Sequence, residues 1–237
     1  MRAPRAVATL AVALLTAAAA AGIGVEAAGA ADECKGLRTC LPVQGPWVVV
    51  PSGGVEYELA CPLPGYIVAG TDARVATRDV DVSFHAETGS PVGPGVTTRR
   101  SVVFEAARSG STAGPSSFQP FIGCIPTRGG GGRALTSVAA GPSGLKPGQP
   151  VRSIVVRRPV RSRAFAVRVV CPSGSRLIGS THAVAFREKS APSQAMLGAV
   201  AVSRVVVGGA VVARVTATST AGPRAEVQVR ALCARAQ

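Results

Sequence analysis

A repeated frame of a Cys-Pro step followed by a distant second cysteine constrains this chain of 237 residues more than any other feature. Cys61-Pro62 is followed by Cys124, and Cys171-Pro172 is followed by Cys233, at separations of 63 and 62 residues. The pentapeptide Ser-Thr-Ala-Gly-Pro at 111–115 returns unchanged at 219–223, within the second frame. The sequence therefore predicts a tandem duplication that builds two similar modules.

The N-terminal segment, 1–30, has the composition of a secretory signal peptide. Arg2 and Arg5 precede an apolar, alanine-rich stretch that ends in Ala28-Gly29-Ala30, which fits the small-x-small rule for signal peptidase. A membrane anchor is the alternative, because the apolar stretch is about 20 residues long. We expect cleavage near Ala30 and a secreted, extracellular protein.

All six cysteines follow this segment, and an even number in an oxidising compartment favours a disulfide framework. The repeated frame selects one pairing among those open to six thiols. The predicted bridges are Cys61 with Cys124, Cys171 with Cys233, and Cys34 with Cys40 across a small N-terminal loop.

Apolar side chains alternate along the segments that lead into the first cysteine of each frame and along the segments that contain the second. A period of two predicts strands with one buried face. The residues predicted to point inward are Val55, Tyr57, Leu59 and Cys61; Phe118, Pro120, Ile122 and Cys124; Phe165, Val167, Val169 and Cys171; and Val227, Val229, Ala231 and Cys233. Glu226, Gln228 and Arg230 have the opposite parity and are expected to face outward.

A bridge that joins two inward faces is typical of a sandwich with a disulfide between its sheets. We predict an all-β protein with two tandem disulfide-stapled β-sandwich modules, Ig-like or jelly-roll-like, after the signal peptide. The first module covers 31–126 with the short cysteine loop, a Gly/Pro-rich connector covers 127–150, and the second module covers 151–237.

The segment 199–215 is expected to form a hairpin that turns at Gly208-Gly209. Trp47 lies upstream of the first bridge, so the tryptophan position of a true immunoglobulin domain is not reproduced.

Two motifs of the second module resemble a known group of exported proteins. They are Val-Val-Cys-Pro-Ser-Gly at 169–174 and Leu-Ile-Gly-Ser-Thr-His-Ala-Val-Ala-Phe at 177–186. This pattern resembles repeated Cys-Pro…Cys β modules of uncharacterised secreted proteins from high-GC actinobacteria. The resemblance implies an exported β protein and assigns no site residue.

Residues that carry catalytic chemistry are few. His85 and His182 are the two histidines, and they occupy non-equivalent places in the two modules. The sequence contains no HExxH motif, no paired CxxC and no Gly-x-Ser-x-Gly elbow. A triad that uses either histidine is an alternative, since triads are assembled in space. We predict a non-enzymatic protein without cofactor or metal, and a secreted hydrolase or an inhibitor of a hydrolase is the second hypothesis.

The charge is divided unevenly along the chain, whose net charge is +14. Residues 31–126 contain seven basic and nine acidic residues, whereas 127–237 contain seventeen basic and two acidic ones. Such a split indicates an anionic partner for the second half, unless arginine serves only for solubility or neutralises the acidic half. Nucleic acid is a weaker hypothesis, because only 4% of the residues are aromatic and secretion argues against an intracellular role.

The densest basic segment supplies the candidate binding residues, which are Arg157, Arg158, Arg161, Arg163 and Arg168. We expect them to contact an anionic cell-wall polymer or a membrane surface. Arg78-Asp79 and Arg187-Glu188 form a second repeated feature, a basic–acidic step at equivalent positions. A solvated strand end explains this step, and a repeated binding turn is the alternative. The predicted function is a secreted structural or binding protein at or beyond the cell surface.

Overall fold

The computed structural model describes residues 32–85, 100–110, 114–126, 151–161 and 163–235, and it is almost entirely β, as the alternation predicts. The predicted signal peptide and the connector 127–150 lie outside the described residues, so both stay predictions. We call 32–126 the first half and 151–235 the second half. Among the described residues, the helical elements are the short helix α1 (Gln194–Leu197) and the 3-10 turn η1 (Ser219–Ala221).

Seven strands from both halves form one sheet, which we call the central sheet. Its strands are β1 (Leu41–Gln44), β2 (Trp47–Val50), β4 (Tyr66–Val75), β7 (Ser116–Pro126), β8 (Val151–Pro159), β10 (Ser175–Phe186) and β13 (Ala225–Arg235). In the first half, β4 pairs with one edge of β7, and β1 and β2 pair in succession with the other edge. In the second half, β13 lies between β8 and β10. All these pairs are antiparallel.

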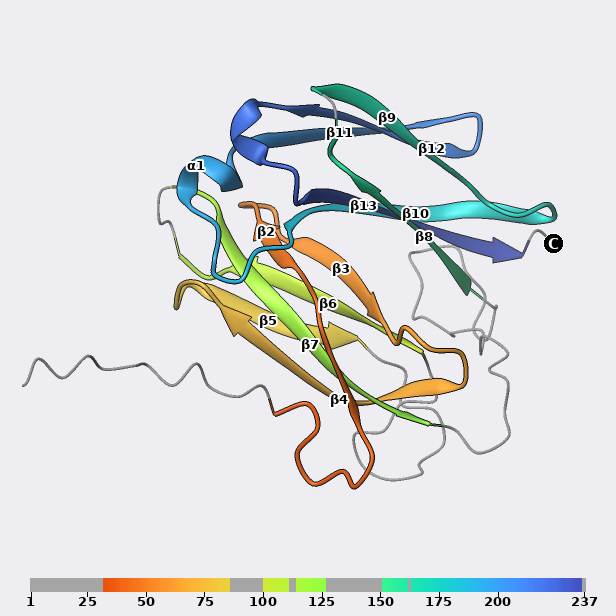
Figure 1. Ribbon diagram of the computed structural model, residues 1–237. Coiled ribbons are helices and arrows are strands. Elements are labelled where there is room, and N and C mark those ends of the chain that lie inside the picture. The colour runs from red at the N-terminus through yellow and green to blue at the C-terminus, as the bar shows by residue number, and fades with distance from the viewer. Residues whose placement is uncertain (1–31, 86–99, 111–113, 127–150, 162, 236–237) are drawn as a thin grey trace, which may run out of the picture. The chain divides into compact units, whose positions relative to one another are not determined.

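Each half adds a sheet of three strands to its part of the central sheet (Figure 1). The first cover sheet contains β3 (Val55–Ala60), β6 (Ser101–Arg108) and β5 (Val80–His85) in that order. The second cover sheet contains β11 (Val200–Val207), β12 (Ala210–Ala217) and β9 (Ala164–Val170). The predicted hairpin is confirmed: β11 and β12 turn at Gly208 and Gly209, whose φ angles of 55° and 73° suit a primed turn.

All three predicted disulfides are confirmed. Cys61 with Cys124 and Cys171 with Cys233 have Cα atoms 5.9 and 5.6 Å apart, and Cys34–Cys40 closes the N-terminal loop. In each half the first cysteine follows a cover-sheet strand and the second lies on a central strand. The two long bridges therefore join the layers, as expected from the inward parity.

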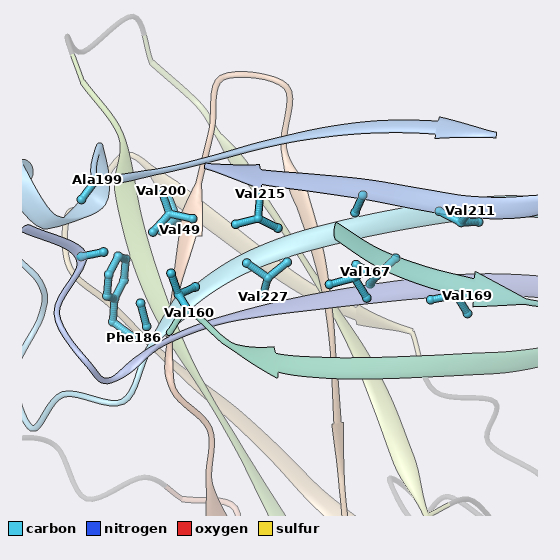
Figure 2. Packing of buried hydrophobic residues seen from close by; sticks show 14 of the residues in the cluster. Val49, Val160, Val167, Val169, Phe186, Ala199, Val200, Val211, Val215 and Val227 are labelled. Atoms are coloured by element: carbon cyan, nitrogen blue, oxygen red, sulfur yellow. The ribbon is translucent and has the colours of Figure 1, made fainter. Parts of the chain in front are cut away.

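Two hydrophobic clusters fill the space between the layers. Figure 2 shows the second-half cluster, which contains Val167 and Val169 of β9, Val211 and Val215 of β12, and Val227 of β13. The clusters exchange residues at the junction of the halves. Val49 of β2 packs into the second-half cluster, while Ala183 and Ala185 of β10 pack into the first-half cluster.

The pairing of β2 with β10 makes the central sheet continuous across the two halves. This ladder is short, with Val48 opposite Ala185 and Trp47 opposite Phe186. Beyond it, the edge of β10 toward Ser175 has no strand partner among the described residues. The halves are therefore joined by main-chain hydrogen bonds over a few residues only, and side chains make the remaining contacts between them.

Candidate functional site

The structure divides the five predicted binding arginines among three places. Arg161 and Arg163 lie in the connection between β8 and β9 and line a hollow. Arg158 is exposed near the end of β8, and Arg168 is exposed on the outer face of the second cover sheet. Arg157 points the other way, toward the first half. The five residues therefore do not form one patch, and only Arg161 and Arg163 line a common surface depression.

The hollow beside Arg161 and Arg163, here called the arginine hollow, has a volume of about 490 Å³. Backbone hydrogen bonds hold its two walls together. Val160 N donates to Ala225 O, and Ala217 N donates to Arg163 O, both at 2.8 Å. These bonds anchor the basic connection between β13 and the end of β12.

The opposite wall of the arginine hollow is the second copy of the repeated pentapeptide. Thr218 and Ser219 are exposed and place hydroxyl groups along it, and Ser219 begins η1. Thr218 N donates to Ala199 O at 2.9 Å, and the segment leaves through Gly222, whose φ is 69°. Guanidinium and hydroxyl groups both donate hydrogen bonds, and no residue that lines the hollow is acidic. Such a set of donors suits an oxyanion.

Arg157 is committed to the contact between the halves. One of its terminal nitrogens donates to Glu58 O, and its guanidinium carbon lies 5.7 Å from the centre of the Tyr57 ring. Both contacts are with β3 of the first half. Arg157 therefore supports docking between the halves and is a poor candidate for an external ligand.

Glu226 and Gln228 of β13 face away from the core of their own half, as expected, but they are buried there, at 7% and 1% exposed. They are covered by β3 of the first half. Gln228 Oε1 accepts from Glu58 N at 2.8 Å, and Gln228 Nε2 donates to Glu58 O at 2.9 Å. This side-chain amide satisfies the free edge of β3 as a neighbouring strand would.

Charged pairs complete this contact. Arg230 NH1 lies 2.5 Å from Glu56 Oε2, and Arg230 Nε lies 3.2 Å from Glu58 Oε2. Glu226 accepts from Tyr57 Oη at 3.1 Å and from Arg187 Nε at 2.7 Å. Burial, followed by the nearby Glu226 carboxylate, raises the pKa of Tyr57 well above its usual value, so its hydroxyl stays a donor. Part of the charge asymmetry is thus neutralised between the halves.

A second depression, here called the His182 groove, has a volume of about 600 Å³ and lies where both halves meet the free edge of β10. It combines Thr181 and His182 of β10 with Arg204 of β11 and with Ser83 and three carboxylates of the first half. Those carboxylates belong to Glu56, Asp81 and Glu105. Burial and then the Arg204 charge lower the pKa of His182, which favours a neutral ring.

The His182 groove is the place where the alternative of a hydrolase would have to act. It holds a histidine, hydroxyl groups and carboxylates, which are the residue types of a triad. Across the described residues, however, no hydrogen bond joins the His182 ring to a hydroxyl or a carboxylate. His85 ends β5, and nothing of its side chain is described.

The repeated basic–acidic steps at the ends of β4 and β10 make ion pairs, so neither step is simply a solvated strand end. Asp79 Oδ2 lies 3.4 Å from Arg108 Nε, and Glu188 Oε2 lies 3.1 Å from Arg224 NH1. Arg78 is exposed, whereas Arg187 binds Glu226. These pairs give the steps a structural use within each half.

Comparison with protein-family models, curated proteins and solved structures finds no match to this chain. Within the described ranges, no helix is long and apolar enough to cross a membrane. The same ranges contain no group of three or more His, Cys, Asp or Glu residues that could hold a metal ion.

Sequence reasoning found the arginines of the hollow but missed its hydroxyl wall. Ser219 is the first residue of the repeated pentapeptide, and Thr218 directly precedes it. Two features of the sequence could have indicated this wall. The pentapeptide recurs next to the end of a strand, and the same half contains a basic connection between two other strands.

Proposed function

We propose that the protein is a secreted, non-enzymatic binding or structural protein that attaches to an anionic surface outside the cell through its second half. The ligand chemistry is a phosphate- or carboxylate-bearing polymer or headgroup layer. One observation carries the proposal. Arg161 and Arg163 line a hollow with the hydroxyls of Thr218 and Ser219, and no acidic residue lines it.

The charge balance of the second half supports this function. Its two acidic residues are already paired, Glu226 with Arg187 and Glu188 with Arg224. Arg161 and Arg163 are exposed, and no carboxylate of the described residues forms an ion pair with them. Exposed cations without internal partners attract polyanions over a range set by salt screening.

The test measures binding of the purified protein to soluble polyphosphate chains. We expect affinity to fall steeply as salt rises from about 50 to about 200 mM, because binding releases condensed counterions. Changing Arg161 and Arg163 together to Gln should weaken binding about tenfold and reduce the salt dependence. Thermal stability should change little, since exposed charges contribute little to folding.

The matched control changes Arg38 and Arg78 to Gln. Both arginines are exposed in the first half, so the net charge changes equally while the arginine hollow stays intact. Equal weakening in the two double variants would show that binding follows net charge alone. That result would remove the arginine hollow from the proposal, and absence of binding by the unaltered protein would overturn the proposal itself.

A further inference from the structure

Exposed valines gather at one end of the second cover sheet. Val170, Val205, Val206 and Val207 are 53%, 40%, 58% and 57% exposed, and they account for four of the seven large apolar residues exposed in the described ranges. Strand register brings them together, because Val170 of β9 and Val207 of β11 both lie opposite Ala210 of β12. We call this end of the sheet the valine tip.

The valine tip projects from its sheet. A Cβ atom added at Gly208 or at Gly209 would meet no atom within 4 Å, so nothing packs against the turn. Register places Val170, Val205 and Val207 on one face of the sheet and Val206 on the other, so apolar side chains are exposed on both faces of the tip. Such a cluster is unusual in water, whereas scattered apolar residues are ordinary on protein surfaces. The arrangement indicates a surface that another apolar phase covers.

Charge on the same sheet is uniformly positive. β9, β11 and β12 contain Arg168, Arg204 and Arg214 and no acidic residue. Arg168 and Arg214 are exposed and share the outer face with Val205, since Arg168 and Val205 both lie opposite Val212. The acidic residues of the second half lie elsewhere, since Glu188 follows the end of β10 and Glu226 lies on β13 opposite Pro159, the last residue of β8.

We propose that the valine tip inserts into the headgroup region of an anionic lipid bilayer while Arg168 and Arg214 contact lipid phosphates. This inference rests on the proposed function and deepens it by naming a lipid surface as the anionic partner. A soluble polyanion would neutralise the arginines and leave the valines in water. A second copy of the chain would bring equal charges of the same face together across a symmetric interface. An anionic bilayer supplies both an apolar phase and negative charge.

The test measures partition of the full purified protein onto vesicles of phosphatidylglycerol mixed with phosphatidylcholine. The variant changes Val205, Val206 and Val207 together to Thr, which keeps the side-chain shape and the preference for strands. We expect about tenfold weaker partition, because three apolar side chains no longer favour the bilayer. The control changes Leu63 and Val75 to Thr, two exposed apolar residues of the first half, and should leave partition unchanged.

A second reporter is a tryptophan at the tip. Trp47 is 3% exposed, so its emission should not respond to vesicles. In the variant Val206→Trp, emission should shift to shorter wavelength on binding, and lipids brominated on their acyl chains should quench it. Self-association would instead shift the emission with protein concentration in the absence of vesicles, and that outcome would overturn the inference.

Binding to soluble polyphosphate separates the two proposals. The valine-to-threonine variant should bind polyphosphate as well as the unaltered protein does. If it also binds vesicles normally, the tip inference is wrong and the anion-binding function stands. If the unaltered protein binds neither polyphosphate nor vesicles, the proposed function fails. Equal partition onto pure phosphatidylcholine would overturn the role given to Arg168 and Arg214.

Discussion

The two halves share one strand framework and differ in what covers it. In the first half, β4 pairs with β7 and shifts register between Val68 and Gly70; in the second, β10 pairs with β13 and shifts between Leu177 and Gly179. Gly70 lies opposite the residue that precedes Cys124, and Gly179 lies opposite the residue that precedes Cys233. Both glycines therefore occupy the same place in the ladder.

The residue opposite that glycine decides which half accepts the N-terminal loop. In the first half it is Gly123, and a Cβ there would lie 2.1 Å from Glu33 O; a Cβ on Gly70 would lie 2.0 Å from the same oxygen. In the second half it is Leu232, which packs beside Gly179. The ladders are otherwise equivalent at this position. Where the residue is glycine the N-terminal loop packs against the strand, and where it is leucine the leucine side chain occupies that space.

The two halves also differ in the charge of the side chains that face away from their cores. The first half supplies Glu56 and Glu58 to the contact between the halves, and the second half supplies Arg230 and Arg157. The second half still exposes arginines at the hollow and on its cover sheet. The two halves therefore share a strand framework, but the side chains that face away from the core differ. In one place these side chains join the two halves, and in another they are exposed and can bind a ligand.

The largest change in the free energy of unfolding is expected at the glycine pair where the two halves differ most in the space around the Cβ position. Gly123→Ala should destabilise the protein by about 2–3 kcal/mol, because the new methyl group meets the backbone of the N-terminal loop and cannot be relieved by a side-chain rotation. Gly179→Ala should stay within about 1 kcal/mol of the unaltered protein, since its Cβ would lie 3.4 Å from Leu232 in ordinary contact. Urea denaturation measures both, and equal losses would break the proposed difference between the halves.

A smaller loss is expected from the contact between the halves. Arg230→Gln should cost about 2 kcal/mol, because it leaves the nearly buried Glu58 carboxylate without its ion-pair partner. Arg224→Gln removes the pair with Glu188, whose side chains are 58% and 29% exposed, and should cost less than about 1 kcal/mol. If the two losses are equal by urea denaturation, the contact between the halves contributes no more than a surface ion pair.

The sequence predicted the framework because a period of two reports directly on burial. The parity of Tyr57 and Val229 placed both in a core, and the matched cysteine spacing selected the bridges that form. The turn at Gly208-Gly209 was recognisable because only glycine readily takes two successive positive φ angles.

The sequence could not show in the same way what covers the face of each strand that points away from its own core. Alternation shows that Gln228 points away from its own core, but polar residues at that parity are equally typical of solvent and of a polar contact. The ladder between β2 and β10 has only two residue pairs, too short to leave a periodic signal. Arg161 and Arg163 share a parity, yet they lie between strands, and they line one hollow because backbone hydrogen bonds hold the connection beside the end of β12.

The smallest expected effect compares His182 with Ala73, its counterpart in the repeat. Because burial and Arg204 lower the pKa of His182 in the folded protein, the unfolded chain takes up a proton first as the pH falls through the ordinary value of 6.5. Stability should therefore decrease as the pH falls through that value, and should level off below the folded pKa. His182→Gln should remove this component. The free energy of unfolding, measured between about pH 8 and about pH 5 for both proteins, decides the matter. Parallel curves would show that the groove leaves the His182 ring as hydrated as in the unfolded chain, and would contradict this prediction.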